Sequence, residues 1–162
     1  MEKIDHSIDY KSDGWDKFYD DKGDSWRDKD YRLLHELFAV KVLKGSLIDV
    51  GCGLGDGLRM LRETADGVTQ FSGTDFASET IERNKNNPLL RGIDFFSHDI
   101  TQPLPARYDN VICLQTLEHL HEPALAMNNL INATREVLIV ATPYKNRRPD
   151  ENHLWSFNIV SS

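Results

Sequence analysis

Glycines and acidic residues alternate in one short stretch of the chain, residues 47–57, which reads L-I-D-V-G-C-G-L-G-D-G. A dense run of glycines lets a ligand come close to the backbone. The dinucleotide fingerprint G-x-G-x-x-G fits poorly, because Asp56 stands at the third glycine position when counting starts at Gly51. Asp49 and Asp56 would also repel a pyrophosphate, which binds to bare N–H groups at a helix N-terminus. The stretch therefore favours a ligand that carries positive charge.

Two more carboxylates follow later apolar runs. Asp75 lies twenty residues after Gly55, where a carboxylate can accept hydrogen bonds from both hydroxyls of a ribose. Asp99 follows the next run, and it can accept a hydrogen bond from the exocyclic amine of adenine. S-adenosylmethionine combines a ribose and an adenine with an ammonium and a sulfonium group. The charges therefore favour S-adenosylmethionine over NAD as the cofactor, with S-adenosylhomocysteine as the product.

Histidines near a fourth apolar run could take part in proton transfer. The segment after that run reads Q-T-L-E-H-L-H-E-P and contains His119, and His153 follows near the end of the sequence. The pKa of a histidine lies near working pH, so either residue could accept a proton from a substrate hydroxyl. We predict His119 and His153 as catalytic residues. Methyl transfer depends mainly on in-line positioning, so a general base is not obligatory.

The elements that must position these residues follow from the periodicity of the sequence. Apolar residues with helical spacing predict a helix over residues 30–43, and the period then changes to short buried runs separated by helices. Such runs without polar alternation are typical of a parallel sheet that is covered on both faces. We expect an α/β fold with a doubly wound, mostly parallel sheet, in which ligands bind beyond the carboxyl ends of the strands. The expected strands are 46–50, 71–75, 94–97, 110–114 and 137–141, and the expected helices after the first are 56–64, 77–86 and 123–133.

Four quoted stretches carry a resemblance to a known family. They are L-I-D-V-G-C-G-L-G-D-G, G-T-D-F at the second strand, S-H-D-I at the third, and Y-D-N-V-I-C-L-Q-T-L-E-H-L-H-E-P at the fourth. Together they resemble class I S-adenosylmethionine-dependent methyltransferases, and in particular the group with E-H-L-x-x-P after strand four, which includes ubiquinone-pathway enzymes. The likeness covers about residues 45–157 and implies a Rossmann-like fold and methyl transfer to an oxygen, nitrogen or carbon nucleophile of a small molecule.

The resemblance also implies roles for individual cofactor-binding residues. Most of these residues lie at or just after strand ends, and one belongs to a W-D-x-x-Y type segment that folds over the cofactor. Asp49 with Gly51, Gly53 and Gly55 would hold the methionine part, Asp75 the ribose, and Asp99 with Ile100 the adenine. Phe76 would lie against the adenine face, Gln115 would bring its backbone near the sulfur, and Tyr19 belongs to the segment that folds over the cofactor.

The sequence departs from the family near its end. Class I enzymes add strands six and seven, whereas this sequence stops at Ser162, so we expect those strands to be missing and the chain to be truncated at its C-terminus. We expect an N-terminal arm or cofactor lid over residues 1–30 and the S-adenosylmethionine-binding domain over 31–162. An exposed last strand favours dimerisation, so we expect a homodimer through that sheet edge. Two alternatives are a truncated, non-catalytic cofactor-binding domain and an NAD-dependent oxidoreductase.

A metal site is a further alternative. Glu118, His119, His121 and His153 resemble the residues of small-RNA 2'-O-methyltransferases, in which E-x-x-E-H and a later histidine bind a divalent metal. Here Gln115 replaces the first glutamate, and the loss of a carboxylate weakens a site for a hard cation. We therefore expect no metal, with Glu118 and His119 shaping the pocket. Because N-P-P-Y is absent after the fourth strand, methylation of a nucleobase amine is disfavoured.

Composition restricts the partners and the compartment. The 162 residues suffice for one domain, and 19 basic against 26 acidic residues give a net charge of -7, which argues against a broad nucleic-acid surface. No stretch approaches the roughly 20 apolar residues of a membrane span or resembles a signal sequence. The two cysteines, Cys52 and Cys113, fit a reducing compartment. We expect a soluble, cytoplasmic protein that acts on a small-molecule acceptor.

Overall fold

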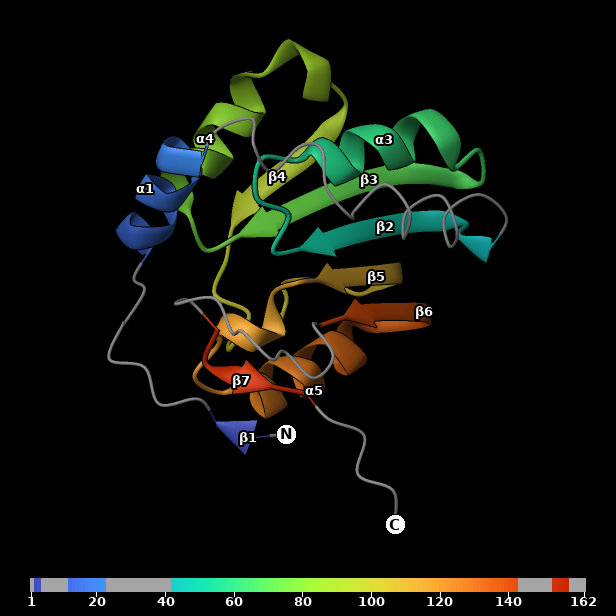
Figure 1. Ribbon diagram of the computed structural model, residues 1–162. Helices are drawn as coiled ribbons and strands as arrows, with labels where there is room; N and C mark the ends of the chain where they lie inside the picture. Colours follow the sequence, from blue (N-terminus) through green and yellow to red (C-terminus); the bar gives the residue numbers. More distant parts are fainter. Residues whose placement is uncertain (1, 4–11, 23–41, 143–152, 158–162) are drawn as a thin grey trace.

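A five-stranded parallel sheet lies at the centre of the computed structural model, which describes residues 2–3, 12–22, 42–142 and 153–157 (Figure 1). Its strands lie in the order β4-β3-β2-β5-β6, and every neighbouring pair is parallel. The chain starts in the middle at β2 and turns to the other side at β5, so the switch point lies beside these two strands. The strands are β2 (Gly45–Val50), β3 (Val68–Asp75), β4 (Ile93–Ser97), β5 (Tyr108–Leu114) and β6 (Thr134–Ala141).

Helices cover both faces of this sheet, because successive side chains of a strand point to opposite faces. Leu47 packs into a core cluster with leucines of α3 (Asp56–Thr64) and with Ile81 of α4 (Ser78–Asn86). The next residue, Ile48, packs into a second cluster with Leu130 of α5 (Pro123–Ala133). Two short 3₁₀ helices, η2 (Pro88–Leu90) and η3 (Leu117–His119), complete the connections. The expected doubly wound sheet is thereby confirmed.

The expected elements agree closely with the observed ones. The helices predicted over 56–64 and 123–133 have those bounds, and the strands begin one to three residues earlier than predicted. The early starts occur because polar residues such as Thr69 and Arg135 extend β3 and β6 beyond their apolar centres. Of the helix expected over 30–43, only Val42 and Leu43 fall within the described residues.

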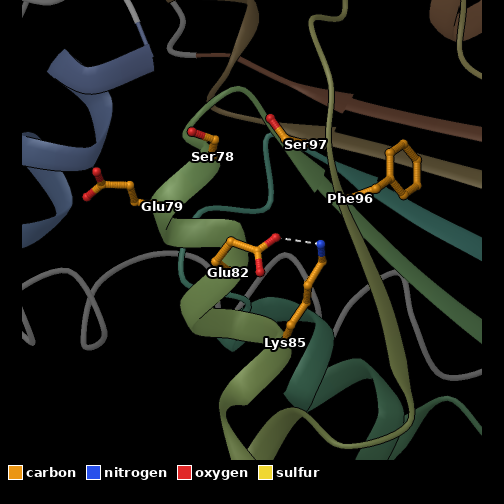
Figure 2. Close-up of a pocket in the computed structure, with 6 residues that line it drawn as sticks. All are labelled: Ser78, Glu79, Glu82, Lys85, Phe96 and Ser97. Atoms are coloured by element: carbon orange, nitrogen blue, oxygen red, sulfur yellow. Dashed lines mark hydrogen bonds and ion pairs between the residues drawn. The ribbon is translucent and has the colours of Figure 1, made fainter.

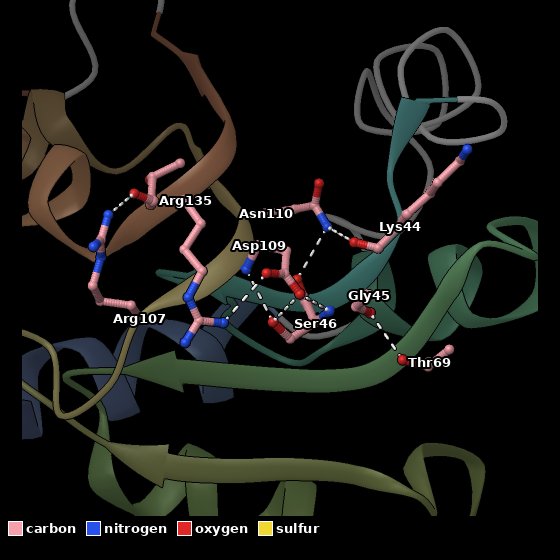
Figure 3. A network of polar contacts seen from close by, with 9 residues as sticks. Lys44, Gly45, Ser46, Thr69, Arg107, Asp109, Asn110 and Arg135 are labelled. Carbon is pink, nitrogen blue, oxygen red and sulfur yellow. Dashed lines mark hydrogen bonds and ion pairs between the residues drawn. The ribbon is translucent and has the colours of Figure 1, made fainter.

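A polar network aligns β2 with β5 at the edge of the sheet opposite their carboxyl ends (Figure 3). One carboxylate oxygen of Asp109 accepts hydrogen bonds from the backbone N–H and the hydroxyl of Ser46, each at 2.8 Å. The amide of Asn110 donates to the carbonyls of Lys44 and Ser46, and Arg135 donates to Asp109 at 3.3 Å. The bonds from Ser46, and then Arg135, hold the pKa of Asp109 below its usual range. The network thereby fixes the register of β2 against β5, and this register positions the residues at the carboxyl ends of the two strands.

Residues near the start of the chain form a helix that the sequence pattern did not indicate. Helix α1 (Ser12–Lys22) packs beside α4 (Figure 1). Asp16 is buried there and accepts hydrogen bonds from Thr80, while the exposed side chain of Asp20 pairs with Arg83. The predicted arm over residues 1–30 therefore contains, in its described part, a helix docked on the sheet's helical layer.

The two ends of the described chain meet. Strand β1 (Glu2–Lys3) pairs antiparallel with β7 (Trp155–Ser156) as a separate two-stranded sheet. Neither strand belongs to the central sheet, whose edge on that side is β6 among the residues that the structure describes. In the same part of the chain, no helix combines the length and the apolar character that crossing a bilayer requires.

Candidate functional site

The glycine-rich loop connects β2 to α3 at the switch point of the sheet. Gly51, Gly53 and Gly55 have φ values of 78°, 49° and 77°, a region that L side chains rarely adopt. The N–H of Gly51 donates to the carbonyl of Thr74 at 2.8 Å, which fastens the loop to the end of β3. Gly55 also precedes α3, so the loop leads directly into a helix N-terminus. These conformations explain why glycines alternate in the sequence.

Two buried carboxylates lie at this end of the sheet, Asp49 on β2 and Asp75 on β3. Asp75 accepts hydrogen bonds from the N–H groups of Gly53 at 2.8 Å and Ala77 at 3.0 Å. Burial still raises the pKa of Asp75, and burial together with the charge of Asp75 raises the pKa of Asp49 to about 7. Both groups would ionise more readily beside a positively charged ligand. The sequence-predicted pair therefore lies together, close to the predicted glycines.

Gln115 follows β5 and has a backbone conformation that is rare for its residue type. Its φ is 52°, and it is the one non-glycine residue with positive φ in the described ranges. Its N–H donates to the carbonyl of Ala141 at 2.7 Å, which holds the strained residue at the carboxyl end of the strand. Such outliers concentrate at functional sites. The next residue, Thr116, packs against Gly51, since a Cβ built on Gly51 would lie 2.2 Å from the Thr116 hydroxyl.

The residues predicted to hold an adenine lie after β3 and β4. One oxygen of Asp99 accepts hydrogen bonds from the N–H and the hydroxyl of Thr101, at 2.9 and 2.8 Å, which fixes the turn after β4. Ile100 is buried, and its carbonyl accepts from Asn129 of α5. Phe76 is 42% exposed, which is unusual for a phenylalanine next to a buried carboxylate. Its exposed ring is available to contact a ligand.

A shallow groove of about 310 Å³ lies nearby on α4 and β4 (Figure 2). Its walls include the ion pair of Glu82 with Lys85, which are both exposed. None of the predicted cofactor-binding residues is among its lining residues, which are Ser78, Glu79, Glu82, Lys85, Phe96 and Ser97. The groove is therefore a surface feature beside the site at the strand ends and not the site itself.

Two aromatic side chains of α1 contact the site, Tyr19 at the glycine loop and Trp15 at the segment after β5. The hydroxyl of Tyr19 donates to a carboxylate oxygen of Asp75 at 3.4 Å, and the same hydroxyl lies 3.0 Å from the position of a Cβ on Gly53. Trp15, one helical turn earlier, packs edge-on against His119 with a ring centroid distance of 4.9 Å. The helix thus contacts the loop with one aromatic residue and the segment after β5 with another.

The two predicted catalytic histidines lie against each other. The rings of His119 and His153 are 4.9 Å apart at an interplanar angle of 66°. The C-terminal segment is held there by backbone contacts, because the N–H of Leu154 donates to the carbonyl of Glu118 at 2.7 Å. The carboxyl group of Glu118 has no exposed surface, and burial raises its pKa to about 7. No local spacing predicts that residues 119 and 153 meet; only the resemblance to small-RNA 2'-O-methyltransferases placed them in one set.

Sequence reasoning missed several residues that support the site. Asn84 of α4 donates its side-chain amide to the carbonyl of Gly53 at 2.7 Å, and Thr116 supports Gly51. Trp15 and Asp16 belong to the W-D-x-x-Y type segment that the resemblance singled out, but their individual contacts with His119 and with α4 were not predicted. A polar residue on the inner face of an amphipathic helix, such as Asn84, was the available signal. The contacts of Thr116 and Trp15 depend on tertiary packing and leave no local pattern.

Comparisons with known proteins agree with this geometry. The model of a family described as Methyltransferase domain matches residues 24–158. The chain is similar to the ubiquinone biosynthesis O-methyltransferase of Neisseria meningitidis serogroup C (strain 053442), with 24% identity, covering 78% of this chain and 59% of that protein. The chain thus spans less than two thirds of that relative's length.

Two solved structures show the same fold. One is the complex of DhpI with SAH, with 17% identity and a TM-score of 0.68, covering 84% of this chain and 69% of that chain. The other is a SAM-dependent methyltransferase from Aquifex aeolicus, with 16% identity and a TM-score of 0.66, covering 91% of this chain and 82% of that one. At these identities the structural likeness concerns the arrangement of the chain.

Proposed function

This chain belongs to the methyltransferase domain family, and from that membership we propose that it binds S-adenosylmethionine and transfers the methyl group to a small-molecule nucleophile. The observation that carries the proposal is the pair of buried carboxylates, Asp49 and Asp75, beside a loop of positive-φ glycines. Burial raises both pKa values, and a cationic ligand beside the two carboxyl groups would lower these pKa values again because it stabilises the ionised forms. S-adenosylmethionine supplies an ammonium, a sulfonium and a ribose diol, which match this set of acceptors.

The residues take the cofactor in order along the strand ends. Asp49 and the three glycines, Gly51, Gly53 and Gly55, hold the methionine part, and Asp75 accepts from the ribose hydroxyls. Asp99 and Ile100 hold the adenine amine and ring edge, and the exposed ring of Phe76 lies against the adenine face. Tyr19 closes over the ribose, which the contact of its hydroxyl with Asp75 supports. The backbone of Gln115 lies near the sulfur.

The chemistry is an in-line displacement at the methyl carbon. The acceptor's lone pair forms a bond to that carbon, the carbon–sulfur bond breaks, and the sulfur keeps the electron pair, so that S-adenosylhomocysteine is released. The name of the curated relative supports an oxygen acceptor. We propose that His119 or His153, whose rings pack against each other beside η3, accepts the acceptor's proton. Most of the rate enhancement would come from holding donor and acceptor in line.

The remaining assignments follow from the same frame. We propose that residues 1–30 act as the lid, because α1 contacts both the glycine loop and His119, and that residues 31–162 form the cofactor-binding domain. Two free cysteines support a cytoplasmic location. We also propose a homodimer through the edge strand β6, which has one strand neighbour among the described residues.

Calorimetric titration tests the cofactor assignment. We expect S-adenosylmethionine and S-adenosylhomocysteine to bind with one-to-one stoichiometry and to raise the melting temperature, while NADH does neither. Protection by NADH without protection by S-adenosylhomocysteine would point to the oxidoreductase alternative. Binding of S-adenosylmethionine without turnover, across a panel of phenol, carboxylate, amine and carbon acceptors, would point to the non-catalytic alternative.

A further inference from the structure

Three metal-ligating side chains converge just beyond the carboxyl end of β5. Glu118 and His119 belong to η3, and His153 comes from the C-terminal segment. One ligand atom of each lies within 4.8 Å of the others. All three side chains are largely shielded, with exposures of 0% for Glu118, 16% for His119 and 8% for His153. The cluster joins two adjacent residues, Glu118 and His119, to His153 from a distant part of the sequence.

The carboxylate of Glu118 supplies an independent observation. Both of its oxygens are buried, and neither has a hydrogen-bond partner in the part of the chain that the structure describes. Nε2 of His119 lies 3.9 Å from Oε1 of Glu118. A buried carboxylate without hydrogen bonds is strongly unfavourable unless a proton or a cation neutralises it. The unpaired carboxylate lies close to the two imidazoles, so a cation bound between the three side chains would neutralise it.

The backbone holds the ligands' segments together independently of their side chains. The N–H of Leu154 donates to the carbonyl of Glu118 at 2.7 Å, and the indole N–H of Trp155 donates to the carbonyl of Leu120 at 2.6 Å. Trp15 also packs against the ring of His119, with a centroid distance of 4.9 Å. These contacts place His153 beside Glu118 and His119 before any ion binds, which reduces the entropy lost on ligation.

The spacing suits a small divalent ion. Zinc binds imidazole nitrogens and carboxylate oxygens at about 2.0–2.2 Å, so two of its tetrahedral ligands lie about 3.4 Å apart. The observed 3.9 Å from His119 to Glu118 exceeds this by about 0.5 Å, a shift that side-chain rotation supplies. The widest separation of 4.8 Å requires a larger rotation, which the same side-chain torsions allow.

We propose that Glu118, His119 and His153 bind one divalent cation of the zinc class. Two imidazoles and one carboxylate are the ligands that zinc and related transition metals prefer, whereas magnesium prefers oxygen ligands alone. This differs from the expectation of no metal that the replacement of a glutamate by Gln115 suggested. That expectation concerned a hard cation, and only the resemblance to small-RNA 2'-O-methyltransferases grouped His153 with Glu118; the structure places the two side chains together.

Three protein ligands leave coordination positions open to water or to an acceptor oxygen, and a cation there would lower the pKa of such an oxygen. This role rests on the proposed function, since Gln115, placed near the methyl donor, lies three residues before Glu118. With the cation bound, His119 and His153 act as ligands, so the proton-accepting role proposed above for one of them applies to the cation-free chain. Binding of the cation itself does not depend on methyl transfer, so it can be tested separately.

The test uses the full chain, stripped with a chelator and titrated with ZnCl₂ by calorimetry and by competition with a chromophoric chelator. We expect one zinc per chain, a higher melting temperature with zinc, and little response to MgCl₂. Glu118→Gln and His153→Ala should each weaken zinc binding at least about 100-fold, beyond the 10–100-fold typical of an outer-shell partner. His121→Ala is the matched control, because it removes a histidine two residues from His119, and it should bind zinc as the unaltered chain does.

The same titrations can overturn the proposed metal site. Absence of stoichiometric zinc binding, or equal losses in His121→Ala and His153→Ala, overturns it. Unchanged zinc affinity in Glu118→Gln would also overturn the metal site. Glutamine has nearly the same shape as glutamate, and the melting temperature of the metal-free variant shows whether it has folded. A cobalt-substituted chain adds a second readout, since its visible spectrum should be lost in Glu118→Gln. If the chain binds S-adenosylmethionine normally but does not bind zinc, the metal site is rejected and the proposed function still stands.

Discussion

Asp16 of α1 lies at the amino-terminal end of α4, where one of its carboxylate oxygens accepts hydrogen bonds from the N–H and the hydroxyl of Thr80, at 2.8 and 2.9 Å. Its other oxygen accepts from the N–H of Glu79 at 3.3 Å. Ala77, the residue that precedes α4, has no side chain that could cap the helix. A residue more than sixty positions earlier in the sequence therefore supplies the cap, and the cap fixes α1 over the site.

Loss of this cap should destabilise the protein and loosen α1. We expect Asp16→Ala to lower the free energy of unfolding by about 1–2 kcal/mol, the range for a lost N-cap. Affinity for S-adenosylmethionine should fall as well, because Tyr19 is carried by the same helix. Urea unfolding and calorimetry measure the two effects. Asp20→Ala is the control, since its pair with Arg83 is exposed to solvent and should contribute little. Equal effects of the two substitutions would contradict the capping role.

The carboxylate of Asp75 should dominate the recognition of the ribose. We expect Asp75→Asn to weaken binding of S-adenosylmethionine by about 1.5–3 kcal/mol, the scale of hydrogen bonds to a charged group, or roughly 10–150-fold in Kd. Calorimetric titration measures the change. Asp66→Asn serves as the control, because Asp66 lies exposed in the turn before β3. An unchanged Kd in a folded Asp75→Asn variant would refute the assignment.

Gly51 should be needed for two separable reasons, its positive φ and its contact with Thr116. A Cβ on Gly51 would meet both branches of the Thr116 side chain at 2.2 and 2.8 Å, whereas one on Gly92, with φ of 88°, would meet nothing within 4 Å. Gly92→Ala should cost about 1–2 kcal/mol from backbone strain alone. Gly51→Ala should cost about 1–3 kcal/mol more from overpacking.

Denaturant unfolding of both variants measures this difference. Adding Thr116→Ala to Gly51→Ala should recover part of the overpacking cost, because the colliding hydroxyl and methyl are removed. If Gly51→Ala and Gly92→Ala prove equally stable, the close contact with Thr116 is not what requires the glycine.

The raised pKa of Asp49 predicts a dependence of stability on pH. Burial raises this pKa from 3.8 to about 7, so the folded chain binds the proton more tightly than the unfolded chain does. Ionisation therefore destabilises the cofactor-free fold progressively as pH rises from about 4 to about 7, with no further change above that. We expect the melting temperature to fall between pH 5 and pH 8, and to fall less in Asp49→Asn.

The cofactor should reverse part of this trend. A cationic ligand favours the ionised carboxylate, so S-adenosylmethionine should raise the melting temperature more at pH 8 than at pH 5.5. Thermal unfolding with and without the cofactor provides the measurement. Parallel melting curves for Asp49→Asn and the unaltered chain across this range would show that Asp49 is not the titrating group.

The central sheet was predictable because short stretches of the sequence are enough to identify its strands. The run that ends at Val50 is short, mostly apolar and bounded by glycines, and acids at or just beyond such runs mark the carboxyl ends of the strands. The cofactor-binding part of the site was predictable for the same reason, since Asp75 and Gly53 lie at or just after the ends of neighbouring strands. Their hydrogen bond, at 2.8 Å, follows from the parallel order of those strands.

Other features depend on contacts that the local sequence does not encode. Helix α1 is polar, and its aromatic residues pack on partners that are distant in sequence, so its periodicity is weak as a signal. The two-residue strands β1 and β7 are too short for any pattern. His153 reaches His119 through the hydrogen bond of Leu154 with Glu118, which links segments more than thirty residues apart. Tertiary packing decides each of these cases.

The pairing of β1 with β7 affects the order in which the site is completed during synthesis on the ribosome. The glycine loop, Asp75 and Gln115 lie within residues 51–115, so they leave the exit tunnel before the C-terminal segment. His153 follows later, and β1 finds its observed partner only once Trp155 and Ser156 have emerged. Since chains fold from the N-terminus as they are made, a nascent chain would gain the cofactor-binding side first and the histidine pair last.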